Sequence, residues 1–242
     1  MIDSDQKRDT LISAGQNRRM FDSIASRYDL MNAILSLGMD GYWRGSAVRC
    51  LAPGPGHRVL DIGSGTGDVA LEVLRQEPMA TVTGIDPAST MLRVARDKAL
   101  RRGLHMNISF ETGDASALRY AAGSFERVIS AFCIRNVEVR EKAFAEMYRV
   151  LKPGGRAVIL ELTKPEKMTV RQGHRFYNRI IVPTVGRLFS KGDAYRYLVD
   201  SIDDFPESEV IVEKMRSGGF EEVRRIPLTF GVVTIFTGRH PI

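Results

Sequence analysis

The sequence contains little cysteine. Among its 242 residues only Cys50 and Cys133 are cysteines, and they do not form a Cys-x-x-Cys pair. A small secreted protein held together by disulfides would contain several pairs of cysteines. We therefore expect two free thiols in a protein that works in a reducing compartment.

Long apolar segments are also absent. No stretch of about 18 apolar residues occurs, so the sequence predicts no membrane-spanning helix. Residues 1–19 are polar and charged and lack the apolar centre of a secretory signal, so no such signal is expected. These absences predict a cytoplasmic location. The net charge of +6 permits peripheral contact with an anionic membrane at its inner face.

Clusters of metal ligands and internal repeats are missing as well. The four histidines are scattered, and no group of His, Cys and Asp has the spacing of a metal site, so no metal is expected. The basic charge would suit an enzyme acting on nucleic acid. However, basic and aromatic residues are not interleaved, and no Asn-Pro-Pro-Tyr motif follows the fourth expected strand, so no nucleic-acid partner is predicted.

What the sequence does contain is an alternation of strand-type and helix-type segments. This alternation is typical of a parallel sheet with helices on both faces, and we expect a Rossmann-like α/β fold with a mostly parallel seven-stranded sheet. The expected strands cover 58–62, 81–85, 107–111, 127–133, 156–162, 222–229 and 231–239, the last two as an antiparallel pair. The main expected helices cover about 87–102, 137–151 and 208–217, and Lys-Pro-Gly-Gly at 152–155 is expected to end the second of them.

The length fits one α/β domain with an insertion, and a hydrophobic content of 43% allows a sizeable core. We expect a helical segment, 1–52, that covers the site and a main domain, 53–242. Within the main domain, residues 164–206 are expected to form a lid over the substrate. Arg171, Arg175 and Arg179 fall on one helical face of this insertion, which suits an anionic membrane surface. The alternative is a solvated charged face over an apolar core stripe.

The most informative stretch is Arg-Val-Leu-Asp-Ile-Gly-Ser-Gly-Thr-Gly-Asp at 58–68. A strand, a loop with glycines at 63, 65 and 67, and a helix from about Thr66 would form a nucleotide-binding crossover. Glycine allows a positive φ and lets a ligand approach the backbone closely. The alternative is an ordinary tight turn without a ligand.

The third glycine of this loop separates two kinds of ligand. A dinucleotide fingerprint would have glycine at position 68, where this sequence has Asp68. A carboxylate would repel a pyrophosphate but suits a ligand with a positive centre. The loop therefore favours S-adenosylmethionine, whose sulfonium is positive, over the NAD of an oxidoreductase.

Further candidates follow the next expected strands. Asp86 ends the second strand and could bind the ribose hydroxyls, or could only cap the next helix. Asp114 and Ala115 follow the third strand and could bind adenine, or could only form a turn. Met91 could pack on the adenine ring, although core packing is the alternative.

The fourth strand is followed by Arg135 and Asn136 at the same edge of the sheet. One interpretation is a polar pair that stabilises a substrate oxyanion, and the other is a salt bridge that holds the edge together. Cys133 has no histidine nearby in sequence, so we expect it to pack rather than to act as a nucleophile.

The segments LDIGSGTGD, GIDPASTML, GDA and RVLKPGGR resemble class I S-adenosylmethionine methyltransferases. More specific are FDSIASRYDLMNAILSLGMDGYWR at 21–44, FCIRNV at 132–137, LELTKP at 160–165 and DAYRYLVDSIDDFP at 193–206. Together, from about residue 18 onward, these segments resemble the ubiquinone/menaquinone biosynthesis C-methyltransferase family. That family methylates a ring carbon of a prenylated quinol, and the resemblance favours demethylmenaquinol over the ubiquinol-pathway benzoquinol.

The resemblance also implies site residues. Cofactor binding is implied for Thr66, Asp86, Asp114 and Ala115, and a catalytic role for Tyr28, Asp29, Arg135 and Asn136. The further cofactor-binding candidates in this sequence are Asp61, Gly63, Gly65, Met91 and Ala131. In the mechanism it implies, Arg135 favours a phenolate whose ortho carbon takes the methyl group, and Asn136 orients it. Tyr28, Asp29 and His174 are alternative candidates for the general base.

The sequence departs from the family pattern at three places. Ala131 replaces a frequent serine, Cys133-Ile134 replaces Gly-Leu, and 228–233 lacks the usual second glycine. The alternatives to a quinol methyltransferase are an enzyme acting on another small aromatic or polyketide-like molecule, and a non-catalytic cofactor-binding subunit. A homodimer is a further expectation.

Overall fold

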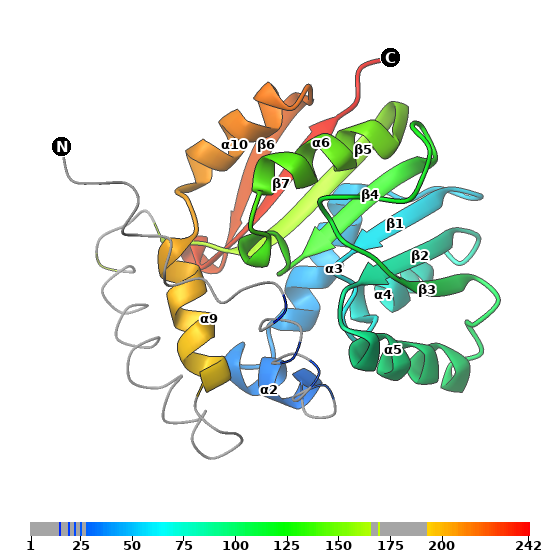
Figure 1. The fold of residues 1–242 in the computed structure, drawn as a ribbon, viewed down its shortest axis with the longest axis horizontal. Helices are drawn as coiled ribbons and strands as arrows, with labels where there is room; N and C mark the ends of the chain where they lie inside the picture. The colour runs from blue at the N-terminus through cyan, green and yellow to red at the C-terminus, as the bar shows by residue number, and fades with distance from the viewer. Residues whose placement is uncertain are drawn as a thin grey trace.

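The computed structural model describes residues 28–165 and 193–242, together with the single positions 15, 19, 22, 25 and 169 (Figure 1). The predictions for Arg171, Arg175, Arg179 and His174 lie outside these residues, as does most of 1–27.

The described residues form a seven-stranded sheet in the order β3-β2-β1-β4-β5-β7-β6 (Figure 1). β3, β2, β1, β4 and β5 are parallel, and β7 pairs antiparallel with both β5 and β6. The predicted fold class and the final antiparallel pair are confirmed. The strands are β1 Arg58–Ile62, β2 Thr81–Asp86, β3 Ile108–Thr112, β4 Phe125–Ala131, β5 Leu151–Leu162, β6 Glu221–Leu228 and β7 Val233–Arg239.

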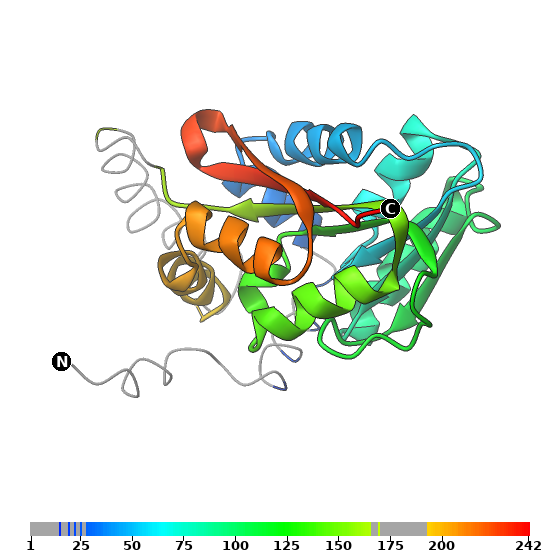
Figure 2. The same ribbon diagram turned by 90° about the horizontal axis from the view of Figure 1, so that it is seen from above.

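Helices cover both faces of this sheet (Figure 2). α3, α4 and α5 pack on one face, and α6 and α10 pack on the other. The α-helices are α2 Tyr28–Leu35, α3 Asp40–Leu51, α4 Asp68–Gln76, α5 Ser89–Arg101, α6 Arg140–Val150, α9 Asp193–Asp204 and α10 Ser208–Ser217, and the short 3-10 helices are η2 Ile134–Asn136 and η4 Thr229–Gly231.

β1 shows why a central strand of this sheet has apolar residues at successive positions. Val59 packs toward α3 and α4, whereas Leu60 and Ile62 pack toward the opposite helices, and all three are buried. A parallel strand that is covered on both faces needs apolar side chains at successive positions. α3, from the predicted 1–52 segment, packs Ala47, Val48 and Leu51 into this same core.

Two of the differences from the predicted boundaries have a clear cause. α6 ends at Val150, within one residue of the predicted end, but 152–155 already belongs to β5 rather than to a loop, because Leu151 pairs with Phe125 and Gly154 N donates to the carbonyl oxygen of His240. β4 ends at Ala131 rather than at Cys133, since Phe132 adopts a left-handed φ of 57° and turns the chain into η2. This turn brings Asn136 to the edge of the sheet.

Within the part of the chain that the structure describes, no helix is both long and apolar enough to cross a bilayer. Cys50 and Cys133 are both free, as predicted.

One carboxylate is embedded in the apolar interior. Asp61 in β1 is 0% exposed, and neither of its oxygens has a hydrogen-bond partner among the described residues. Burial raises the pKa of Asp61 to about 7, and the nearby Ser64 hydroxyl opposes this rise only in part. The folded protein therefore holds a proton on Asp61 at pH values where the unfolded chain has released it.

This gives a prediction for stability. Because the folded-state pKa is raised, the protein should lose stability as pH rises from about 4 to about 7, and Asp61→Asn should remove that loss. Between about pH 5 and pH 8, urea unfolding should show the variant gaining roughly 2–3 kcal/mol relative to the wild type. The exposed Asp97→Asn is the matched control. An equal pH dependence in both variants would contradict this account of Asp61.

Candidate active site

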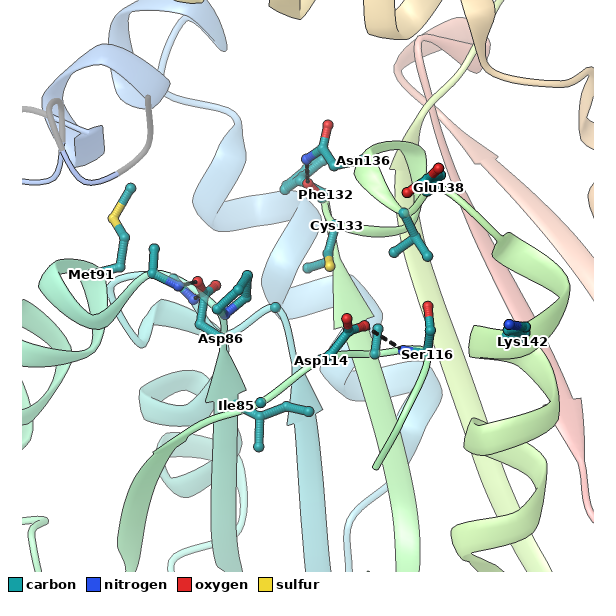
Figure 3. Close-up of a pocket in the computed structure, with 18 of the residues that line it drawn as sticks. Ile85, Asp86, Met91, Asp114, Ser116, Phe132, Cys133, Asn136, Glu138 and Lys142 are labelled. Atoms are coloured by element: carbon teal, nitrogen blue, oxygen red, sulfur yellow. Dashed lines mark hydrogen bonds between the residues drawn. The ribbon is translucent and has the colours of Figure 1, made fainter. Parts of the chain in front are cut away.

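A cavity of about 300 Å³ opens at the carboxyl ends of β1, β2, β3 and β4 (Figure 3). Its volume lies in the range of small-molecule sites. Nine of the thirteen predicted site residues line it: Tyr28, Gly63, Gly65, Asp86, Met91, Asp114, Ala115, Ala131 and Asn136. Asp29, Asp61, Thr66 and Arg135 do not.

The glycine loop forms one wall of the cavity. Gly63 has a φ of 72°, and a Cβ there would lie 2.3 Å from Sγ of Cys133, so no larger residue fits. Gly65 has a φ of 54°, and a Cβ there would meet no protein atom within 4 Å. At Gly65 a ligand can therefore contact the backbone of the loop without meeting a side chain.

Asp86 connects this loop to the next strand. Its Oδ2 accepts a hydrogen bond from Gly65 N at 2.9 Å, and its Oδ1 accepts one from Ala88 N at 2.8 Å. Asp86 thus ties the glycine loop to the turn before α5, whose first helical turn has no side-chain cap, and it also lines the cavity. Burial raises the pKa of Asp86 to about 6.

The far wall contains the other cofactor candidates. Asp114 is exposed, and its Oδ1 accepts a hydrogen bond from Ser116 N at 2.7 Å (Figure 3). Met91 is 1% exposed, and it packs against Met31 and Ala88 while also lining the cavity. For both residues the structure combines the packing or turn role with a place at the cavity.

Arg135 is not among the residues that line the cavity. Its Nη1 lies 2.9 Å from Oε2 of Glu161 and donates to the carbonyl oxygen of Phe132 at 2.7 Å. The backbone N–H of Arg135 also donates to Oε1 of Glu161, at 3.1 Å. The salt-bridge alternative is therefore present in the structure. Only Asn136 of the predicted pair lines the cavity.

Thr66 belongs to the glycine loop, and Asp29 in α2 contacts it. The Thr66 hydroxyl donates to Oδ1 of Asp29 at 2.5 Å, and Lys98 forms an ion pair with Oδ2 of Asp29 at 2.5 Å. Asp29 therefore joins α2 to the loop, while its neighbour Tyr28 lines the cavity.

Sequence reasoning missed Glu161 and Lys98. Glu161 is an acid inside the apolar strand Val-Ile-Leu-Glu-Leu, which is itself a sign of a buried partner. Lys98 lies in a helix with many charged residues, and nothing local distinguishes it from them. Cys133 does line the cavity, but burial raises its pKa to about 12, so it is not a nucleophile.

Solved structures of other proteins have the same fold. The [4+2]-cyclase SpnF superposes with a TM-score of 0.68 at 20% identity, covering 94% of this chain and 96% of that one. A Thermotoga maritima protein described as an S-adenosylmethionine-dependent methyltransferase gives 0.64 at 20% identity, covering 91% of this chain and 98% of that one. At these identities the likeness shows the fold alone.

Curated relatives are much more similar in sequence. The ubiquinone/menaquinone biosynthesis C-methyltransferase UbiE of Geobacter sulfurreducens is 43% identical over 91% of this chain and 87% of its own length. The demethylmenaquinone methyltransferase of Bacteroides fragilis is 40% identical over 92% of this chain and 91% of its own length. The profile of the ubiE/COQ5 methyltransferase family matches residues 9–240. The resemblance seen in the sequence is confirmed, and the chain belongs to the ubiE/COQ5 methyltransferase family.

Proposed function

We propose that this chain methylates a ring carbon of a prenylated quinol, with demethylmenaquinol as the favoured substrate and S-adenosylmethionine as the methyl donor. The observation that carries the proposal is a cavity bounded by the glycine loop, Asp86 and Asn136 in a chain that matches quinone-pathway methyltransferases over nearly its whole length.

The residues around the cavity fit this cofactor. Asp86 has lone pairs left for ribose hydroxyls, Asp114 and Ala115 can meet adenine, and Gly65 leaves room for the methionine part. Asp61 is buried without a hydrogen-bond partner in the described part of the chain and has a pKa raised to about 7, and a positive centre bound nearby would favour its ionised form. When bound, the cofactor supplies an electrophilic methyl group on sulfur.

The chain's own residues must then activate the quinol. A ring carbon becomes nucleophilic when the neighbouring hydroxyl loses its proton, and a polar group that binds the resulting oxyanion favours that state. Asn136 lies at the cavity and can donate to this oxygen. Arg135 contributes indirectly: its contacts with Glu161 fix the turn that carries Asn136. Tyr28 is at the cavity and remains a candidate base.

The direct test of the activity is a substrate panel. Labelled S-adenosylmethionine should transfer methyl to demethylmenaquinol under reducing conditions, and more slowly to a demethylated benzoquinol of equal tail length. Product analysis by mass spectrometry should place the new methyl on carbon. Methylation of non-prenylated aromatics alone would contradict the quinol assignment and favour the small-aromatic alternative.

A second prediction concerns the buried pair. Arg135→Ala should lower turnover by about a hundredfold or more, because the turn carrying Asn136 loses its anchor, while affinity for S-adenosylhomocysteine stays within about threefold. Because this variant leaves Glu161 buried without its partner, the double variant Arg135→Met/Glu161→Leu tests the same point with both charges removed. Unchanged turnover in a folded double variant would remove the pair from the mechanism.

We also propose peripheral contact with a membrane of anionic lipid, from which a prenylated substrate would be taken. Phe230 supports this proposal: it is 81% exposed and has a left-handed φ of 57° in η4, which follows β6 at the edge where the cavity opens. The η4 turn is held in place because Trp43 Nε1 donates to the Thr229 hydroxyl at 2.8 Å. The net charge of +6 would attract such a surface.

Co-sedimentation with liposomes tests this contact. The full chain should bind vesicles that contain anionic lipid at low salt, and Phe230→Ser should weaken that binding several-fold. Met106→Ser is the matched control, because Met106 is 83% exposed but precedes β3 at the opposite edge of the sheet. Equal losses in both variants, or no binding by the wild type, would contradict the contact.

A further inference from the structure

Lys98 links three elements of the fold beside the cavity. It lies in α5 with a side chain that is only 14% exposed. Its Nζ is 2.5 Å from Oδ2 of Asp29 in α2 and 2.7 Å from Oδ1 of Asp68, the first residue of α4. One ammonium group therefore pairs with two carboxylates that come from different helices.

Asp29, which pairs with Lys98, also contacts the glycine loop. Oδ1 of Asp29 accepts the hydrogen bond of the Thr66 hydroxyl at 2.5 Å, so each oxygen of this carboxylate has a partner. Thr66 follows Gly65, whose N–H is held by Asp86. Tyr28, which precedes Asp29, lines the cavity. The position of Lys98 thus sets where Tyr28 lies relative to the loop.

The apolar attachment of α2 is confined to a small cluster. Met31 is the one buried residue among its eight, and Leu30 is 56% exposed. Met31 packs with Ala25, Ala88 and Met91, and the partly buried Tyr28 and Leu35 pack against the same cluster, which is separate from those on the two faces of the sheet. The ion pair between Asp29 and Lys98 therefore adds to a limited apolar contact.

The ion pairs of Lys98 belong to a larger group of charged side chains. Asp68 also lies 3.8 Å from Arg44, and Arg44 is ion-paired with Asp40. Burial opposes the charge of Arg44, but Asp68 and Asp40 outweigh it and raise the pKa of Arg44. If Lys98 were neutral, Asp29 would lose this ion pair and Asp68 would keep only Arg44, so the attraction that holds α2 to the loop would weaken.

We propose that Lys98 is a positioning residue for the cofactor: by holding Asp29 against Thr66 and Asp68, it keeps α2 and Tyr28 closed over the site and so limits how fast the cofactor leaves. The proposal rests on the S-adenosylmethionine site of the proposed function but not on the quinol substrate.

Stopped-flow dissociation of S-adenosylhomocysteine from the full chain tests this role without any quinol. Lys98→Met should raise the dissociation rate about tenfold and change the association rate much less. Asp29 and Asp68 are 40% and 29% exposed, so salt reaches the contact. Raising ionic strength from about 0.01 M to about 0.15 M should therefore speed dissociation from the wild type but not from Lys98→Met.

Three further variants separate positioning from general stability. Lys98→Arg keeps the charge and should restore slow dissociation, whereas Arg101→Met removes an exposed charge from the same helix and should change nothing. Lys98→Met and Asp29→Asn should not be additive when combined, because both break one contact. Additive effects, or a Lys98→Met rate within twofold of the Arg101→Met rate, would overturn the proposal. If quinol methylation fails in its own assay, these rates still decide the role of Lys98.

Discussion

The site depends on one hydrogen bond between neighbouring strands. Gly65 N donates to the carboxylate of Asp86 at 2.9 Å, which ties the loop after β1 to the end of β2. Since the same carboxylate also accepts from Ala88 N, the loop and the start of α5 are fixed to one group. A parallel sheet places such strand ends at one edge, so this group stands at the mouth of the cavity.

Burial gives the charged residues around the cavity different roles. Asp61 is enclosed without a partner and has a raised pKa, whereas Glu161 is enclosed with Arg135. A buried carboxyl group with a raised pKa can ionise when a cationic ligand binds near it, while a paired carboxylate mainly holds structure in place. Hence the two acids, both in the apolar strands of the sheet, contribute in different ways to a site for a positively charged methyl donor.

The attachment of α2 differs from that of α3. Tyr28 of α2 lines the cavity, and Tyr28, Met31 and Leu35 pack in a small apolar cluster that also includes residues of α5 and of α9, which lies beside α2 (Figure 1). Ala47, Val48 and Leu51 of α3 belong instead to the large apolar cluster on one face of the sheet. The two helices are therefore anchored separately, α3 in the core and α2 beside the cavity.

The sequence alone determined the sheet, because apolar runs separated by helical segments leave few arrangements that bury them. It also placed the glycine loop, Asp86 and Asn136 at one edge of the sheet, where they line the cavity, since a segment that follows a parallel strand starts at that edge. Only the tertiary structure decided that Arg135 turns to Glu161 and that Asp29 meets Lys98. Those partners are distant in sequence, and which side of a short turn a long side chain takes depends on the charges that folding brings near it.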